Sequence, residues 1–341
     1  MRGVELMKEY RARLPIHASQ EEALLLDEPA QSSSKFRDQM SKKAPVAVFI
    51  PTYNRGRAVI FVLERVLACD PQPTEIWVHI DQCDGVLERE IGERFPSVNV
   101  LTSADRLGPG GGRHRCLSVC RTPYAVSLDD DSWPADRDFF AAIEPLFSEY
   151  PQAAIFGASI WHRSEAPKIR NALIRRVVSY VGCGHAIRVA AYRDVRGYLA
   201  RPMAYGMEES DVGLQLFAKG WHVYSAGVLR VHHDTDRAHH EAAEITAATI
   251  TNLALLAFLH YPTTKFGRGV VQIANRIAFC FQKGRIRGIA GGIAGIFAEC
   301  YRHRALRKPI RHDVFVEYLR LRRAEADWTE HVTSAPIGAR A

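Results

Sequence analysis

The chain has 341 residues, a formal net charge of +7 and a sequence pI near 9.1. This length can bury a sizeable core and predicts one large domain with an appendage. The positive charge favours a polyanionic partner such as nucleic acid, an anionic membrane or a phosphorylated substrate. Seven cysteines without a CxxC pair argue against a disulfide framework and indicate reduced thiols.

The start of the chain lacks the basic-then-apolar pattern of a signal peptide. No segment offers the roughly 18 uncharged apolar residues that a membrane span requires. The nearest candidate, Gly288–Ala298, is shorter and follows two arginines. We therefore expect a cytoplasmic protein that is not integral to a membrane. Residues 1–44 are expected to be a flexible lead-in.

Order is expected to begin at Pro45. The continuous apolar run Val46–Ile50 is typical of a strand buried on both faces, and helical spacing follows over Arg57–Cys69. Strands and helices then alternate at short intervals, which predicts a parallel α/β sheet with right-handed crossovers. The next expected elements are the strands Glu75–Ile80, Val98–Thr102 and Ala125–Leu128, and a helix through Cys116–Cys120.

Polar residues follow each of these strands. Ligands of such sheets bind beyond the carboxyl ends of the strands, so four polar strand ends predict a nucleotide-sized site. Each end alone has an ordinary explanation, because strands usually stop at turn residues. The residues concerned are Asn54 and Arg55, Asp81 and Asp84, Gly108–Gly112 with Arg113, and Asp129–Asp131.

Three successive carboxylates, Asp129–Asp131, end the strand at Leu128, and Pro134 is expected to stop regular structure beyond them. Like charges at a strand end repel one another and need a cation or a ring of donors. If the chain stays extended, Asp129 and Asp131 share a face and Asp130 points away. Two carboxylates on one side suit a hard divalent ion that carries phosphate oxygens.

The glycine-rich stretch beginning at Gly108 excludes two nucleotide motifs. A dinucleotide fingerprint started at Gly108 or Gly110 places Arg113 or Arg115 where its last glycine belongs. A phosphate-binding Walker motif fails because no Gly-Lys-Ser/Thr follows. What remains is a flexible loop that opens a helix, with Arg113 able to neutralise phosphate or the nearby carboxylates.

In the second half, a helix is expected to begin near Glu208 and to end at Gly220. Acidic residues in a first turn favour the helix dipole, but Glu208, Glu209 and Asp211 exceed what capping requires. One of them facing a metal–phosphate site is a candidate general base. The strands expected around this helix are Ala153–Gly157, Val181–Arg188 and His222–Val231.

Histidines complete the candidate set. His232 or His233, at the end of the last strand, is expected to join the metal site. Zinc bound by these two with His239 and His240 is not favoured, since the spacing matches no common zinc pattern. For His185 a structural role is favoured over contact with substrate.

Taken in order, Pro51–Arg55, the aspartates after the second strand, Asp129–Asp131 and Glu208–Asp211 resemble family 2 glycosyltransferases of the GT-A fold. The resemblance covers roughly residues 45–235. It implies a Rossmann-like mixed sheet flanked by helices, in which residues 45–134 bind the nucleotide sugar and 135–235 the acceptor. It also implies a nucleoside-diphosphate-sugar donor, a divalent cation (Mg²⁺ or Mn²⁺) and inversion at the anomeric carbon.

The resemblance assigns roles to individual positions. Asp129 and Asp131 match the DxD pair that contacts ribose and metal, and His232 or His233 matches a late histidine at the metal. Glu209 falls at the position of the usual base, with Glu208 and Asp211 as the neighbouring candidates. His114 follows Arg113 where relatives often contact the sugar. The residues expected at the nucleotide are Pro51, Thr52, Tyr53, Arg55, Asp81, Asp84, Gly108, Arg113, Asp129 and Asp130.

Residues 236–341 are expected to be a basic helical region. From residue 265 to 323, fourteen Lys and Arg stand against three acidic residues, a local excess of +11. Such a region fits an anionic membrane surface and a lipid-linked acceptor, and it fits equally an ordinary basic cap on the catalytic domain. The acceptor is expected to be a glycan, a lipid-linked molecule or a small molecule.

Two other functions remain as alternatives. A sugar-phosphate nucleotidyltransferase shares similar sheets and metals, but it should carry a glycine-rich loop after its first strand, where this chain has Pro51–Arg55. A non-enzymatic protein that binds an anionic surface explains the charge but not the acids at two separate places. Nucleic acid is not expected as a partner.

Overall fold

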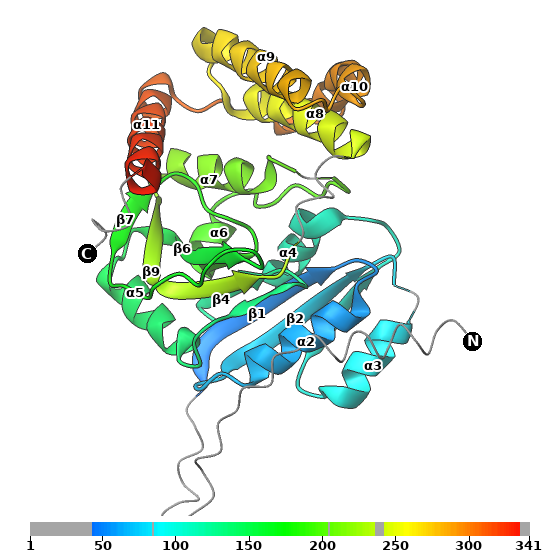
Figure 1. The fold of residues 1–341 in the computed structure, drawn as a ribbon, viewed down its shortest axis with the longest axis vertical. Helices are drawn as coiled ribbons and strands as arrows, with labels where there is room; N and C mark the ends of the chain where they lie inside the picture. Colours follow the sequence, from blue (N-terminus) through cyan, green and yellow to red (C-terminus); the bar gives the residue numbers. More distant parts are fainter. Residues whose placement is uncertain (1–42, 84, 204, 236–241, 335–341) are drawn as a thin grey trace, which may run out of the picture. The chain divides into compact units, whose positions relative to one another are not determined.

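The computed structural model describes residues 43–83, 85–203, 205–235 and 242–334, which belong to one compact unit, with side chains described as far as residue 326. A nine-stranded mixed sheet forms its centre, in the order β3-β2-β1-β4-β8-β6-β9-β5, with β7 also paired to β9 (Figure 1). The strands are β1 (Ala44–Thr52), β2 (Pro73–Asp81), β3 (Asn99–Ser103), β4 (Tyr124–Leu128), β5 (Ser132–Pro134), β6 (Ala153–His162), β7 (Ile174–Val177), β8 (Gly184–Arg188) and β9 (His222–His233).

The strands β1, β2, β3 and β4 are parallel, as the alternation of strands and helices predicts. β1 pairs with β2 and β4, and β2 pairs with β3, all in parallel. β8 then runs antiparallel between β4 and β6, so the whole sheet is mixed. The carboxyl ends of β1, β2 and β4 therefore lie at one edge of the sheet, which is where the polar strand ends meet.

Helices cover both faces of the sheet (Figure 1). Val46, Val48 and Ile50 of β1 share one core with α2, while Ala47 and Phe49 share another with α4. The strand is buried on both faces, which explains its continuous apolar run. The helices before β9 are α2 (Gly56–Leu67), α3 (Val86–Arg94), α4 (Gly108–Val119), the 3₁₀ turn η1 (Phe139–Ala142), α5 (Ile143–Glu149), α6 (Val189–Arg193) and α7 (Glu208–Ala218).

The described residues after β9 are mainly helical. A third core joins Leu214 and Phe217 of α7 to Leu255 and Leu259 of α8 and to Phe315 of α11. Figure 1 shows α8, α9 and α10 gathered beyond α7, away from the sheet. The elements are α8 (Ala243–His260), η3 (Thr263–Lys265), α9 (Phe266–Gln282), α10 (Ile289–Arg302), η4 (Arg304–Leu306) and α11 (His312–Ser334).

Helix α8 is long and apolar enough to cross a membrane by length and composition. The expectation that no segment meets this test, with Gly288–Ala298 as the nearest candidate, is therefore wrong. In the structure 56% of the 18 residues of α8 are buried. Its apolar side chains pack in the core shared with α7 and α11. A buried core helix meets the same criteria of length and composition as a membrane span.

Two local predictions are wrong. Gly110, Gly111 and Gly112 lie inside α4 and not in a loop, because the helix begins at Gly108. The expectation that no regular structure follows the aspartates is also wrong, since Ser132–Pro134 pairs with β9 as the edge strand β5, which ends at Pro134. Proline is tolerated at a sheet edge, where its missing N–H needs no partner.

Candidate active site

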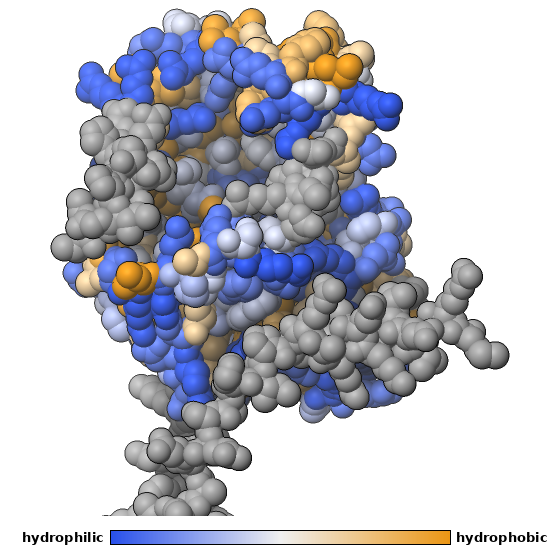
Figure 2. All heavy atoms as spheres, in the orientation of Figure 1, coloured by the Kyte–Doolittle hydropathy of each residue, from blue (hydrophilic) through white to orange (hydrophobic). Residues whose placement is uncertain are grey.

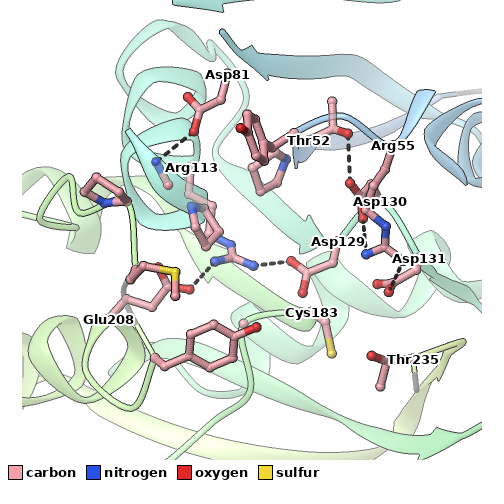
Figure 3. A pocket seen from close by; sticks show the side chains of 18 of the residues that line it. Thr52, Arg55, Asp81, Arg113, Asp129, Asp130, Asp131, Cys183, Glu208 and Thr235 are labelled. Atoms are coloured by element: carbon pink, nitrogen blue, oxygen red, sulfur yellow. Dashed lines mark hydrogen bonds and ion pairs between the residues drawn. The ribbon is translucent and has the colours of Figure 1, made fainter. Parts of the chain in front are cut away.

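A pocket of about 640 Å³ lies at the carboxyl ends of β1, β2 and β4. Figure 3 shows its acidic and basic side chains converging from several elements. Its walls come from the ends of these strands, the start of α4, the residues just before β8, the start of α7 and the start of α8. The lining residues are Pro51, Thr52, Tyr53, Arg55, Asp81, Arg106, Gly108, Pro109, Arg113, Asp129, Asp130, Asp131, Val181, Gly182, Cys183, Pro202, Met203, Tyr205, Gly206, Glu208, Glu209, His233, Thr235, Ala242, Glu244 and Ile245.

Asp81 anchors the start of α4 at the base of the pocket. Its Oδ2 accepts a hydrogen bond from the Gly108 N–H at 2.8 Å, and its Oδ1 accepts one from Ser103 Oγ at 3.0 Å. Gly108 has φ +72° and lies so close to the Arg201 carbonyl that a Cβ would come within 1.9 Å of that oxygen. Only glycine fits there, and the carboxylate holds the helix N-terminus open to the pocket.

Arg113 is the most buried large side chain of the pocket, at 1% exposed. Its Nε donates to Ser127 Oγ at 2.9 Å, its Nη1 to Glu208 Oε1 at 2.6 Å, and its Nη2 to Asp129 Oδ1. Burial alone would lower the pKa of Arg113, but the carboxylates of Asp129 and Glu208 raise it above the usual value. The guanidinium therefore stays charged and joins the end of β4 to the start of α7.

The three aspartates do not alternate as an extended chain would, because β4 ends at Leu128. Asp130 accepts hydrogen bonds from Thr52 Oγ1 at 2.8 Å and Arg55 Nη1 at 2.9 Å. Asp131 pairs with Arg55 Nη2 at 2.9 Å and with His233 Nε2 at 3.1 Å. The expectation that Asp130 points away is therefore wrong, since it shares Arg55 with Asp131.

The environments of these two acids differ. Burial raises the pKa of Asp130 to about 7, despite the opposing effects of Arg55 and Thr52. Burial also acts to raise the pKa of Asp131, but the hydrogen bond with His233 and the charge of Arg55 outweigh it and lower that pKa. Asp131 is thus the acid that stays ionised beside the histidine.

The residues around Asp129 fit a divalent cation. Asp129, Cys183 and His233 place one ligand atom each within 4.8 Å of one another. Cys183 Sγ lies 3.4 Å from His233 Nδ1, while Asp131 contacts the other ring nitrogen. A carboxylate ligand suits hard ions such as Mg²⁺ and Mn²⁺. An imidazole and a thiol favour softer ions. Sequence patterns did not single out Cys183 as a ligand.

His233 and His232 lie on opposite faces of β9, because successive side chains of a strand alternate. His232 packs between Trp133 and Trp161, with ring centroids 4.6 and 5.6 Å away. It is absent from the pocket lining, whereas His233 belongs to it. Of the two predicted histidines, the structure brings only His233 to the acids.

Glu208 and Glu209 present two different carboxylates at the start of α7. Glu208 is buried and held by Arg113, whereas Glu209 is half-buried and accepts a hydrogen bond from the Gly182 N–H at 3.0 Å. Burial raises the pKa of both carboxyl groups, although the charge of Arg113 opposes that effect. A raised pKa is what a proton-accepting carboxylate requires near neutral pH.

Asp211 lies outside the pocket. It is fully buried, and its carboxylate pairs with Arg196 Nη2 at 2.6 Å and with His260 Nε2 at 2.5 Å. Burial acts to raise the pKa of Asp211, but the hydrogen bond with His260 and the charge of Arg196 lower it overall. The structure thus places this predicted acid in an ion-pair network that joins α7 to α8, so its prediction as a base is not supported by its position.

Other histidines also lie away from the pocket lining. His185 is buried, its Nε2 lies 3.1 Å from Tyr198 Oη, and burial lowers its pKa to about 3, which agrees with a structural role. His114 contacts Tyr192 Oη at 2.8 Å. Asp84, His239 and His240 lie outside the described residues.

Arg106 makes a cationic contact at the pocket that no sequence pattern indicated. The Arg106 guanidinium lies 4.4 Å above the centre of the Tyr53 ring, and both residues line the pocket. A ring covered by a guanidinium offers a flat surface of the kind that stacks with bases. The signal was present as an arginine two residues before Gly108, but only the fold places it over Tyr53.

Known proteins share this architecture. Residues 47–195 match the family model described as Glycosyl transferase family 2. No curated protein sequence matches the chain. Mannosyltransferase PcManGT from Pyrobaculum calidifontis, in complex with GDP-Man and Mn²⁺, aligns with a TM-score of 0.51 at 15% identity, over 82% of this chain and 84% of that one.

Two further solved structures are similar. GalNAc-T7 with UDP, GalNAc and Mn²⁺ aligns with a TM-score of 0.54 at 13% identity, over 79% of this chain and 59% of that one. S. aureus TarS 1–349 in complex with UDP-GlcNAc aligns with a TM-score of 0.51 at 13% identity, over 68% and 72%.

The sheet order, the flanking helices and the site at the strand ends define a GT-A fold, which these structures share. Residues 47–195 therefore carry a glycosyltransferase family 2 domain on this fold.

Proposed function

We propose that this glycosyltransferase moves a sugar from a nucleoside-diphosphate sugar to an acceptor hydroxyl with inversion at the anomeric carbon. The observation that carries the proposal is the buried bridge made by Arg113. It ties Asp129, on the side of the nucleotide strands, to Glu208, on the helix that also presents Glu209. A donor side and a base side therefore face one pocket (Figure 3).

The donor is proposed to bind across the ends of β1, β2 and β4. Thr52, Tyr53 and Arg55 line one side of the pocket, and Asp81 lies at its base. The N-terminus of α4 and Arg113 favour negative charge at the diphosphate. The solved relatives are complexes with GDP-Man, UDP or UDP-GlcNAc, so a nucleoside diphosphate is the expected leaving group.

Asp129, Cys183 and His233 would hold the divalent cation, with Asp131 supporting His233. When bound, Mn²⁺ or Mg²⁺ would neutralise the charge that develops on the leaving diphosphate. Asp130 is held by Thr52 and Arg55, so it is proposed to shape the pocket wall rather than to bind the ion.

Glu209 is proposed as the general base. It is half-buried at the pocket, whereas Glu208 is occupied by Arg113 and Asp211 by Arg196 and His260. The acceptor oxygen would form a bond to the anomeric carbon while its proton passes to Glu209. The bond from that carbon to the diphosphate oxygen breaks, and its electron pair leaves with the nucleoside diphosphate. Attack opposite the leaving group inverts the anomeric carbon.

The test is Glu209→Gln, which keeps the shape of the side chain and removes its basicity. We expect UDP or GDP with Mn²⁺ to raise the melting temperature of the variant as much as that of the wild type. Nucleoside diphosphate release from a panel of nucleotide sugars with simple glycoside acceptors should fall by about 10²–10⁴-fold, the size of a general-base contribution.

Glu88→Gln is the matched control, because Glu88 is an exposed acid in the first turn of α3. It should leave both binding and transfer unchanged. Full transfer activity in Glu209→Gln would show that the base lies elsewhere. If no nucleoside diphosphate stabilises the wild type with Mn²⁺, the donor assignment itself is wrong.

The nucleotidyltransferase alternative is less well supported. Its glycine-rich loop should follow β1, yet the glycines of this chain are built into α4 after β3. We also propose that the protein is cytoplasmic and associates peripherally with a membrane. Its acceptor is proposed to be a glycan, a small molecule or a lipid-linked molecule.

A further inference from the structure

Exposed apolar side chains concentrate on α9 and α10. Of the fifteen large hydrophobic residues that are exposed in the described chain, eight lie between residues 270 and 301. Figure 2 shows orange side chains over these helices, with blue residues beside them. We assign six of these eight to the α9–α10 surface: Val270, Phe281, Ile286, Ile293, Phe297 and Tyr301. Phe279 lies two residues from Phe281, on the opposite side of α9, and Val271 lines a groove with α11.

Helix α9 has two apolar faces, and the described residues cover one of them. Cys280 is buried in a core with Ile250 of α8, and Ile273 and Ile277 pack against that core. Val270, Ala274, Ala278 and Phe281 follow one another at helical spacing on a different face, and all four are exposed. The second face has the length and pattern of a contact surface.

Helix α10, which packs on α8 as α9 does, also carries an exposed apolar face. Ile289 and Gly292 are buried, and a Cβ on Gly292 would lie 2.9 Å from the Ala247 oxygen of α8. Ile293, Phe297 and Tyr301 recur every four residues on the outer face, and Phe297 is 84% exposed. No charged residue interrupts the helix before Glu299. Monomeric proteins seldom leave such a run uncovered.

Charge identifies the occupant. Residues 266–298 contain five cations and no acidic residue, and three of the cations lie in the turn between the two helices next to the exposed Ile286. Binding a second copy through the same surface would bring two such clusters together and would be opposed by repulsion. The cations are Arg268, Arg276, Lys283, Arg285 and Arg287.

We propose that the α9–α10 surface docks on an anionic lipid membrane. Bulky apolar side chains enter the boundary between headgroups and acyl chains, and the surrounding cations attract anionic headgroups. The helices lie along the membrane and do not cross it.

The surface adjoins the pocket. Gly288, at the start of α10, contacts the backbone of Ala243, and a Cβ there would lie 2.0 Å from the Ala243 oxygen. The neighbouring Ala242, Glu244 and Ile245 line the pocket. The start of α10 therefore packs against the part of α8 that lines the pocket, so a docked membrane lies near the pocket. We further infer that the acceptor is a lipid-carried molecule. This step alone rests on the proposed function.

The test is flotation of the purified full chain with vesicles of phosphatidylcholine alone or mixed with phosphatidylglycerol. We expect the wild type to float with the anionic vesicles, less so at high salt. Phe281→Ser and Phe297→Ser should each weaken binding by about tenfold or more. Ile169→Ser is the matched control, since Ile169 is 83% exposed on a loop outside the surface and should not matter.

A charge-reversed variant, Lys283→Glu with Arg287→Glu, should abolish the preference for anionic vesicles. Each variant is compared by its melting temperature, so a loss of binding in a folded protein is distinguished from unfolding. Absence of wild-type flotation with both vesicles, or an equal loss in Ile169→Ser, would overturn the proposal. A dimer in light scattering that Phe297→Ser dissolves, without flotation, would assign the surface to a second copy. Flotation needs no donor or turnover, so its failure leaves the proposed glycosyl transfer standing.

Discussion

At the scale of single residues, Arg113 organises the site because its three partners join the end of β4 to the start of α7. Ser127 belongs to β4, Asp129 follows that strand and Glu208 begins α7. A buried cation with two carboxylates is compensated, whereas either carboxylate alone would carry a large desolvation cost. The same contacts leave Glu209 as the acid that is less engaged at the pocket.

Cys183 is the ligand candidate that distinguishes this site from one made of carboxylates and imidazole. Cys183→Ser replaces a soft sulfur with a hard oxygen, so binding should shift from Co²⁺ towards Mn²⁺. We expect the ratio of the Co²⁺ and Mn²⁺ affinities to change by roughly tenfold. Replacing a residue that only hydrogen-bonds a metal ligand already changes metal affinity by that much. Calorimetry measures the affinities, and the thiolate-to-cobalt absorption band should disappear.

Cys300→Ser serves as the comparison, because Cys300 is a half-buried thiol of α10 outside the pocket lining. It should change neither the affinity ratio nor the absorption. If Cys183→Ser keeps the sulfur-to-cobalt band, Cys183 is not a ligand.

At the scale of elements, α4 must approach the sheet closely for Arg113 to reach β4. A Cβ on Gly112 would lie 2.9 Å from His79 Nδ1 and 3.0 Å from Pro51 Cβ, and one on Gly110 would lie 2.7 Å from Glu208 Oε2. Glycine lowers helix stability, but here its small size permits the contact. This packing explains why a stretch that indicates a loop by composition is helical.

Gly112→Ala tests the close approach. Overpacking typically costs about 1–3 kcal/mol, which exceeds the gain of up to about 1 kcal/mol from better helix propensity. We therefore expect a lower free energy of unfolding in urea, and weaker nucleotide binding because Pro51 lines the pocket. Gly92→Ala in α3 meets nothing within 4 Å and should stabilise by about 0.5–1 kcal/mol. Equal effects of the two substitutions would contradict the close approach.

At the scale of the whole described unit, Asp211 joins the sheet domain to the helices that follow it. Its partners are Arg196, before α7, and His260, at the end of α8. Its lowered folded pKa means that it stabilises the fold above its unfolded pKa of about 3.9 and loses that contribution as pH falls through the folded value.

Asp211→Asn should therefore lower the free energy of unfolding at pH 7 by about 3–5 kcal/mol, because the Arg196 guanidinium loses its carboxylate partner. The difference from the wild type should shrink below about pH 4, where the wild-type acid also becomes protonated. Urea unfolding at several pH values measures both effects. Asp105→Asn, at an exposed position, should change stability by less than about 0.5 kcal/mol. An Asp211→Asn penalty that does not depend on pH would contradict the ionised pairing.

Much of the fold was predictable because strands buried on both faces require continuous apolar runs. Val46–Ile50, Glu75–Ile80 and Ala125–Leu128 lie within β1, β2 and β4. The short edge strand β5 was not predicted, since Pro134 and neighbouring acids give no strand pattern. Which of His232 and His233 faces the acids depends on the register of β9 and could not be read from adjacent identical residues.

The sequence by itself determined the apolar strands β1, β2 and β4, the gathering of polar residues at their ends and the basic character of residues 265–323. These follow from local patterns, because burial and charge act on each segment independently. Only the tertiary structure decided that Cys183 joins Asp129 and His233, that Asp211 is a buried ion-pair partner, and that α9 and α10 leave an apolar face uncovered. Those outcomes depend on which distant side chains come into contact, and local patterns carry no information about that.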